Sequence, residues 1–129
     1  MISQDSIKQI SHLFCGDIEG YYSYKSGPQL VAFFNQYFNA SDKYGAGFPS
    51  RWSYVFDKIV AMFSNNTIDT FITTILDKQY IMKDLNIPMV EAAEKSEILY
   101  DELNSIVKRD FFWLFPGKCG WHKAVEVKK

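Results

Sequence analysis

The stretch "RWSYVFDKIVAMF", residues 51–63, carries the clearest helical pattern in the chain. Its large apolar side chains recur every three or four residues, which is the spacing that one face of an α-helix requires. These side chains are Trp52, Val55, Phe56, Ile59, Val60 and Phe63. The pattern predicts a helix with one face on a hydrophobic core, and therefore a mainly helical chain.

The residues just before this helix, "YGAGFPSRW" at 44–52, predict a tight turn into it. Gly45 and Gly47 can adopt positive φ angles, and Pro49 suits the first turn of a helix. Ser50 can accept a hydrogen bond from the free amides at the helix start. These residues explain a corner of the fold, but they do not explain the arginine that follows.

Arg51 opposes the helix macrodipole at this position unless it pairs with a carboxylate or faces an anion. Two interpretations stay open. In the first, Arg51 forms an ion pair with Asp17, Asp42 or a carboxylate of the acidic segment 89–106. In the second, Arg51 contacts an anion or a partner, and then Tyr44, Ser50, Arg51 and Trp52 form a recognition or assembly surface.

Apolar spacing outward from this region predicts four further helices. The first ends at Gly16, the second opens at Ser26–Pro28 after a loop at 17–27, and the last begins near Asn86 and Pro88. The predicted inward residues are Ile7, Ile10, Leu13 and Phe14; Leu30, Phe33, Phe34 and Tyr37; Ile68, Phe71, Ile72, Ile75 and Leu76; and Met89, Ala92, Ala93, Leu99, Leu103 and Ile106 or Val107.

The pattern changes at the C-terminal end. "FFWLF" has no helical spacing, "PGKCG" reads as a turn, and "WHKAVEV" alternates loosely, so a β-hairpin over about 110–127 is predicted. The expected fold class is mainly α, a bundle of about five helices closed by this short hairpin. At 129 residues, the chain is expected to form a single domain over 1–129.

Composition excludes several classes of function. The net charge is −1, so no overall field favours nucleic acid or an anionic membrane. Tyr21, Tyr22 and Tyr24 could stack bases, but Lys25 alone makes a poor electrostatic groove, and nucleic-acid binding is not expected. No signal peptide or membrane-spanning apolar run is recognised, and we expect a cytoplasmic protein.

The sequence shows no recognisable catalytic constellation. It has no glycine-rich phosphate loop and no paired Cys or His spacing for zinc. His12 and His122 lie at opposite ends, as do Cys15 and Cys119, which we expect to be reduced thiols unless they join the termini. We therefore predict no catalytic residues, no metal and no cofactor.

One helix carries an acidic face. Glu91, Glu94, Glu97 and Asp101 follow one another at spacings of three and four residues. Paired carboxylates at such spacing sometimes serve acid–base chemistry, but no second helix offers matching ligands. The two interpretations kept are a solvated polar face and an acidic contact face for a partner.

Two stretches resemble a known family. "SHLFCGDIEGYYSYKSGPQLVAFFNQYF" at 11–38 and "GFPSRWSYVFDKI" at 47–59 are similar to the N-terminal domains of abortive-infection proteins of the AbiJ type, from bacterial antiphage defence. The resemblance implies a sensing, docking or oligomerising domain joined to a separate effector. It assigns no catalytic residue, and only Ser50, Arg51 and Trp52 match something like a motif.

The leading functional hypothesis is therefore a non-enzymatic interaction, sensing or oligomerisation domain of an antiphage system. Its expected partner is a protein or a fused effector domain, and homo-oligomerisation stays open. The alternative is a small phage- or mobile-element-encoded inhibitor that binds a host or defence enzyme through the acidic face. A third hypothesis is a ribonuclease with an unrecognised site.

Overall fold

Six α-helices make up most of the described chain. The computed structural model describes residues 2–110 with their side chains, and the backbone alone of residues 112–115 and 118–123. The elements are α1 Gln4–Cys15, α2 Gly27–Phe38, α3 Arg51–Ser64, α4 Ile68–Leu76, α5 Lys78–Leu85, α6 Met89–Val107, the short 3-10 helix η1 Lys108–Asp110, β1 Phe112–Phe115 and β2 Lys118–Lys123.

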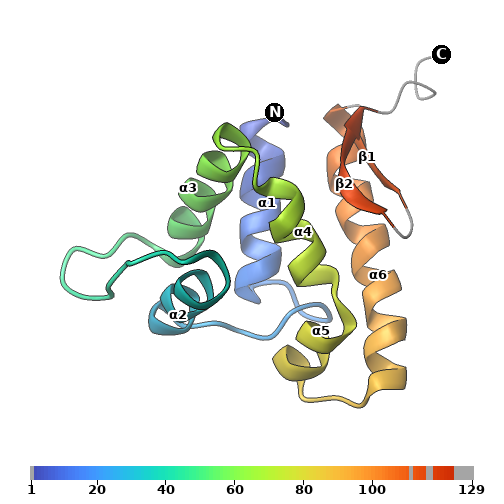
Figure 1. Ribbon diagram of the computed structural model, residues 1–129, viewed down its shortest axis with the longest axis horizontal. Coiled ribbons are helices and arrows are strands. Elements are labelled where there is room, and N and C mark those ends of the chain that lie inside the picture. The colour runs from blue at the N-terminus through green and yellow to red at the C-terminus, as the bar shows by residue number, and fades with distance from the viewer. Residues whose placement is uncertain (1, 111, 116–117, 124–129) are drawn as a thin grey trace.

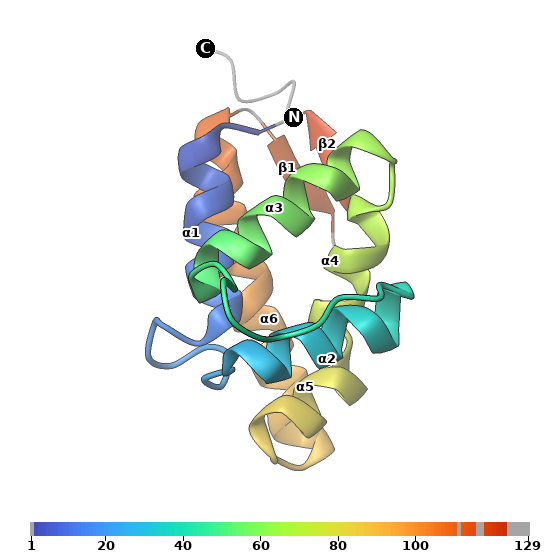
Figure 2. The same ribbon diagram turned by 90° about the vertical axis from the view of Figure 1, so that its left-hand side faces the viewer.

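Helices α1 and α6 run side by side, and the other helices pack around them (Figures 1 and 2). α1 contacts α6 on one side and α3 on the other, while α4 contacts α3, α5 and α6. α2 and α5 lie at the end of the molecule away from the N-terminus. This arrangement brings α2 and α5 together although about forty residues of sequence separate them.

An aromatic cluster in the core fixes α2 against its neighbours. Phe14 of α1 is fully buried, and its ring centre lies 4.8 Å from that of Phe33, 5.5 Å from that of Tyr22 and 5.6 Å from that of Phe71. Phe33 also lies 5.5 Å from Tyr80 of α5, with the rings 68° apart. Edge-to-face contacts of this kind add to the hydrophobic gain from burial.

The predicted boundaries around the first loop are confirmed. Gly16 ends α1 in the left-handed region at φ 83°, where a side chain is also excluded because a Cβ would lie 2.1 Å from the Ser23 carbonyl oxygen. Ser26 begins α2 through a capping box, in which its side chain and that of Gln29 each bond the other's backbone amide.

The predicted count of about five helices is corrected to six. The apolar spacing predicted a helix with inward residues up to Leu76 and assigned no helix between it and Asn86, but the structure has α5 there, after a break at Asp77. Asp77 is extended (φ −68°, ψ 135°), and its carboxylate accepts hydrogen bonds from the amides of Gln79 and Tyr80. Only Tyr80 and Ile81 of the eight residues of α5 are buried, so its apolar spacing gives little sign of a helix.

The prediction of a hairpin over 110–127 also needs correction. Asp110 belongs to η1, and Lys118–Gly120, expected in a turn, lie in β2. The described backbone there consists of β1 and β2 paired antiparallel, with Trp113 opposite His122, packed against α6 and α4 respectively. Residues 111, 116–117 and 124–127 of the predicted range lie outside the described residues.

Some predicted inward residues are corrected as well. Tyr37 is 37% exposed at the C-terminal end of α2, and Met89 is exposed at the start of α6. Both lie in an end turn of their helix, and Tyr37 packs on Phe33 and Tyr80 while the rest of its ring stays exposed. No helix in the described residues is both long and apolar enough to cross a membrane.

Candidate functional site

Arg51, the first residue of α3, joins the end of α1 to the residues just before α2. Its Nη2 donates to the Cys15 carbonyl and its Nε to the Lys25 carbonyl, both at 2.6 Å. Its Nη1 donates to Asp17 Oδ1 at 2.9 Å, and its guanidinium carbon lies 4.1 Å from the centre of the Tyr24 ring. Of the two interpretations of Arg51, the structure contains the ion pair with Asp17.

Asp17 is shared between this arginine and a histidine. Its Oδ2 lies 2.8 Å from His12 Nδ1, and the His12 ring stacks on Trp52 with centres 5.4 Å apart. Burial raises the pKa of Asp17, but the hydrogen bonds from His12 and Arg51 lower it by more, so it lies below its ordinary value. Lys8 Nζ also lies 4.7 Å from the centre of the Trp52 ring.

All four residues of the predicted recognition surface line one open hollow of about 530 Å³. We call it the aromatic hollow. Its lining residues are Asp17, Tyr24, Ser26, Gly27, Pro28, Tyr44, Phe48, Pro49, Ser50, Arg51 and Trp52. Ser50 stands at the cap position of α3, but its side chain makes no capping hydrogen bond, so that part of the prediction is wrong.

Tyr44 reaches across this hollow to the start of α2. A Cβ on Gly27 would lie 2.2 Å from the Tyr44 ring, so the ring rests directly on the glycine backbone. On its other side Tyr44 packs on Phe48, with ring centres 4.7 Å apart. Phe48 in turn packs on Tyr54 of α3 at 4.9 Å. The exposed ring therefore has a defined position on buried supports.

The long loop that carries Tyr44 is anchored through Asp42. The Asn35 side chain both accepts from the Asp42 amide and donates to its carbonyl, each at 3.0 Å. The Asp42 carboxylate accepts from the Tyr54 hydroxyl at 2.7 Å and pairs with Lys58. Lys58 and Tyr54 hold the pKa of Asp42 below its ordinary value. This loop stands out from the helices in Figure 1, yet it is tied to α2 and α3.

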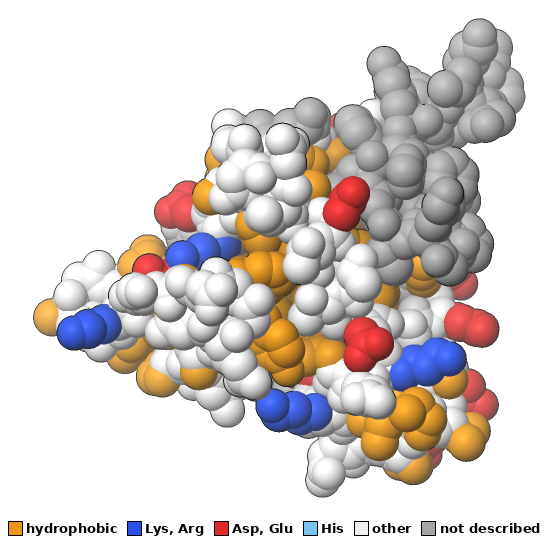
Figure 3. Space-filling view, viewed as in Figure 1, with side chains coloured by type: hydrophobic (Ala, Val, Ile, Leu, Met, Phe, Trp, Pro, Cys, Tyr) orange, Lys and Arg blue, Asp and Glu red, His pale blue; other side chains and the backbone are white. Residues whose placement is uncertain are grey.

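The predicted acidic contact face lies apart from the aromatic hollow, along α6. Its four side chains, Glu91, Glu94, Glu97 and Asp101, are all exposed. Val90 is 72% exposed beside them, and hydrophobic side chains gather over the connection from α5 to α6, with charged side chains around them (Figure 3).

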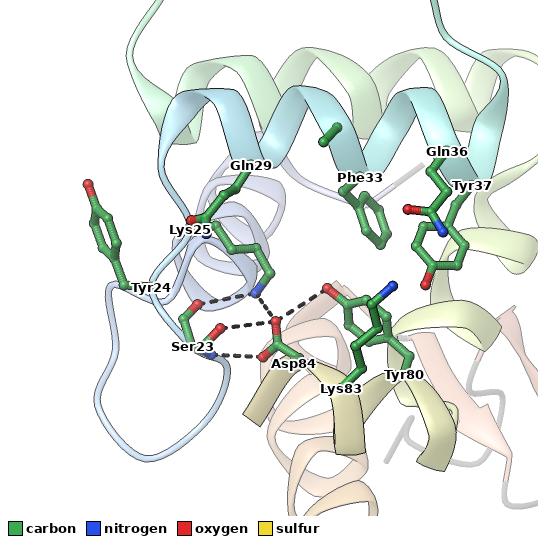
Figure 4. Close-up of a pocket in the computed structure, with 11 residues that line it drawn as sticks. Ser23, Tyr24, Lys25, Gln29, Phe33, Gln36, Tyr37, Tyr80, Lys83 and Asp84 are labelled. Atoms are coloured by element: carbon green, nitrogen blue, oxygen red, sulfur yellow. Dashed lines mark hydrogen bonds and ion pairs between the residues drawn. The ribbon is translucent and has the colours of Figure 1, made fainter. Parts of the chain in front are cut away.

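A second set of polar residues, which the sequence did not single out, lies between α2 and α5 (Figure 4). Lys25 Nζ lies 2.8 Å from Asp84 Oδ1, and the side chains are only 7% and 4% exposed. The ammonium also donates to the carbonyls of Phe14 at 3.0 Å and Ser23 at 3.2 Å. Three acceptors around one nitrogen match the three hydrogens of a protonated lysine.

The Asp84 carboxylate is equally well satisfied. It accepts from the Ser23 amide at 2.9 Å, from the Ser23 hydroxyl at 3.1 Å and from the Tyr80 hydroxyl at 3.4 Å. Burial lowers the pKa of Lys25, and Asp84 opposes that shift, while burial and Asp84 raise the pKa of Tyr80. Since Lys25 and Ser23 belong to the loop before α2 and Asp84 belongs to α5, these contacts hold the loop against α5.

This pair forms one wall of a pocket of about 270 Å³, which we call the α2–α5 pocket. Its lining residues are Ser23, Tyr24, Lys25, Gln29, Ala32, Phe33, Gln36, Tyr37, Tyr80, Lys83 and Asp84. A neighbouring hollow of about 430 Å³ shares Tyr37, Tyr80 and Lys83 with it.

The remaining candidates from the sequence are the two cysteines and His122. Cys15 is a buried free thiol, and burial raises its pKa to about 11, which keeps it protonated and unreactive. The side chains of Cys119 and His122 lie outside the described residues. Among the described residues, no group of three or more His, Cys, Asp or Glu side chains could hold a metal ion.

Comparison of the chain with protein-family models, with curated proteins and with solved structures finds no match. A proposal for what the chain does therefore rests on the geometry of its own residues and on the resemblance of residues 11–38 and 47–59.

Proposed function

We propose that this chain is a non-enzymatic interaction domain of a bacterial abortive-infection system, and that it binds its protein partner through the aromatic hollow. The observation that carries the proposal is the presentation of aromatic rings there. Tyr24 is 62% and Tyr44 is 55% exposed, yet both rings rest on fixed supports, Arg51 and Gly27 respectively.

Such rings suit a binding surface for a physical reason. Tyrosine and tryptophan offer a large contact area with only two side-chain torsions to fix, and they are enriched among the residues that dominate binding energy. Supports that hold the rings before binding reduce the entropy lost when a partner docks. The aromatic hollow combines both properties around Tyr24, Tyr44 and Trp52.

The assignment to antiphage defence rests on the resemblance of residues 11–38 and 47–59. Arg51 of the second stretch binds Cys15, Asp17 and Lys25 of the first. The residues that carry the resemblance thus form one continuous structure at the aromatic hollow, which supports treating them as a unit.

The test is protection against phage by the gene in its native context. Tyr44→Ser removes an exposed ring without opening the core, and Val90→Ser removes a still more exposed apolar side chain from α6 as the control. We expect Tyr44→Ser to lose protection while keeping the wild-type circular dichroism spectrum and melting temperature. Val90→Ser should protect as well as wild type.

Two results would contradict the proposal in different ways. Full protection by Tyr44→Ser would remove the aromatic hollow as the binding surface. Absence of protection by the wild-type gene against a broad phage panel would remove the defence assignment. Light scattering of the purified chain over a concentration series tells whether the bound partner is a second copy, because Tyr44→Ser should then reduce the assembly to a monomer.

A second candidate function is favoured by the exposed Val90 beside the carboxylates of α6, a mixture found at protein-binding surfaces. An inhibitor that binds an enzyme through this face should lose binding when Glu94 and Glu97 are both changed to lysine. It should then keep binding with Tyr44→Ser, which is the opposite of the result expected for the aromatic hollow.

A further inference from the structure

We propose that the α2–α5 pocket binds a small organic anion with a planar apolar body, such as an aromatic phosphate monoester or carboxylate. The proposal is independent of the protein-binding role of the aromatic hollow. It rests on donor groups without partners, on an aromatic wall and on the local charge, which are taken in turn.

Three donor groups at the pocket have no internal partner. Within residues 2–110, the amide of Gln36, the hydroxyl of Tyr37 and the ammonium of Lys83 make no hydrogen bond or ion pair with other described groups. All three line the pocket, on the side away from Lys25 and Asp84 (Figure 4). An amide, a phenol and an ammonium together can bind the oxygens of one phosphate or carboxylate.

The wall beside these donors is aromatic. Phe33 and Tyr80 meet nearly edge to face, at 5.5 Å and 68°, and Tyr37 meets Tyr80 at 5.8 Å and 86°. Perpendicular rings offer both a ring face and a ring edge to a flat ligand. Ala32 is the smallest residue in the lining and leaves room in front of this wall.

The charge of the pocket selects an anion. Lys25 and Asp84 compensate each other at 2.8 Å, so the pair contributes no net charge. Lys83 has no carboxylate partner in the described residues, and it leaves the pocket with one net positive charge. Asp77 lines the neighbouring hollow and not this pocket, and its carboxylate keeps its charge while it accepts hydrogen bonds from the amides of Gln79 and Tyr80.

The size of the pocket limits the ligand to about one or two rings. Its volume of about 270 Å³ is near the lower end of the range for small-molecule sites. The adjacent hollow shares Tyr37, Tyr80 and Lys83, so the apolar body has space to extend beyond the anion-binding donors.

The experiment is a titration of the isotope-labelled chain with phenyl phosphate, followed by NMR chemical shifts. Inorganic phosphate and phenol are titrated separately, since each carries only one half of the proposed chemistry. We expect saturable shifts from phenyl phosphate that are confined to α2, α5 and residues 23–25, with markedly weaker binding of either control compound.

Three variants connect the binding to the pocket. Lys83→Gln should weaken phenyl phosphate binding about tenfold, because one charge-assisted hydrogen bond is lost. Lys78→Gln removes an exposed lysine of the same helix that does not line the pocket, and it should bind as wild type. Ala32→Trp, at an exposed helix position, should fill the pocket and abolish binding without unfolding the chain.

The inference is overturned by any of three results: no saturable shifts with phenyl phosphate, shifts that map outside the pocket, or equal binding by wild type and the Lys83→Gln and Ala32→Trp variants. Equal affinity for inorganic phosphate would show that the aromatic wall plays no part, and would also overturn it.

Discussion

Two cations hold the same loop in this molecule, and they do so in opposite environments. Arg51 binds residues 15–25 from the side of α3, in a partly exposed position, mostly through backbone carbonyls. Lys25 leaves that loop from the other side and pairs with Asp84 in an almost completely buried position. From this comparison we expect burial, more than the number of hydrogen bonds, to decide how costly each anchor is to break.

The largest effect is expected at the Lys25–Asp84 pair, which we call the buried anchor. Asp84→Ala leaves the Lys25 ammonium buried without its counter-ion, and it should lower the free energy of unfolding by about 3–5 kcal/mol. Urea unfolding followed by circular dichroism measures this cost. Combining Lys25→Met with Asp84→Leu should recover part of the loss, because the uncompensated charge is gone.

If the double variant is as unstable as Asp84→Ala, the cost lies in the hydrogen bonds of Ser23 rather than in the buried charge. That result would weaken the distinction between the two anchors.

A smaller effect is expected at Arg51 and its partners, which are partly exposed and which we call the exposed anchor. Arg51→Ala should lower the free energy of unfolding by about 2–3 kcal/mol, because two carbonyl groups lose their donor. Arg51→Lys should restore only a minor part of this, since an ammonium cannot reproduce the forked contacts to Cys15 and Lys25. The same urea titration applies. Arg109→Ala, at a more exposed ion pair with Asp5, is the matched control and should cost less than about 1 kcal/mol.

An Arg51→Lys variant as stable as wild type would contradict the geometry of this anchor. It would mean that the positive charge alone, without the fork, holds the loop.

The smallest effect is the response of the exposed anchor to acid. The pKa of Asp17 is lowered in the folded chain by His12 and Arg51. A lowered folded pKa gives stability that is present above the unfolded value of about 3.9 and is lost as the pH falls through the folded value. We expect a partial loss of stability below about pH 4, measured by urea unfolding at several pH values.

Asp17→Asn should be less stable than wild type at neutral pH and should lose less on acidification. If the two proteins respond to acid in parallel, Asp17 is not the source of the effect, and Asp42 and Asp110, whose pKa values are also lowered, become the alternatives.

The sequence was informative at the two helix ends that flank the first loop, although the cap predicted at Ser50 is absent. Gly16 and Ser26 were identified as helix boundaries because a left-handed residue and a capping serine act within a few residues. The helix α5 was missed because only Tyr80 and Ile81 of its eight residues are buried, which leaves little apolar spacing to detect. Tyr37 was placed in the core because periodicity shows which face a residue is on, but not how completely its neighbours cover it.

The candidate sites divide in the same way. One unusual stretch, residues 44–52, contains all four residues of the predicted recognition surface, so the sequence alone could identify them together. Lys25 and Asp84 are 59 residues apart by their numbers, and nothing near either residue marks it as buried. Only the packing of α5 against the loop before α2 makes them partners, and that packing depends on the whole core.

The tie between Ser23 and Asp84 also has a consequence for the order of folding. Its partners are 61 residues apart, and Tyr21 of the same loop donates to Glu102, 81 residues away. A contact between residues so distant in sequence closes a long loop, which costs conformational entropy. We therefore expect the loop between α1 and α2 to become fixed late in folding, once α5 and α6 have docked.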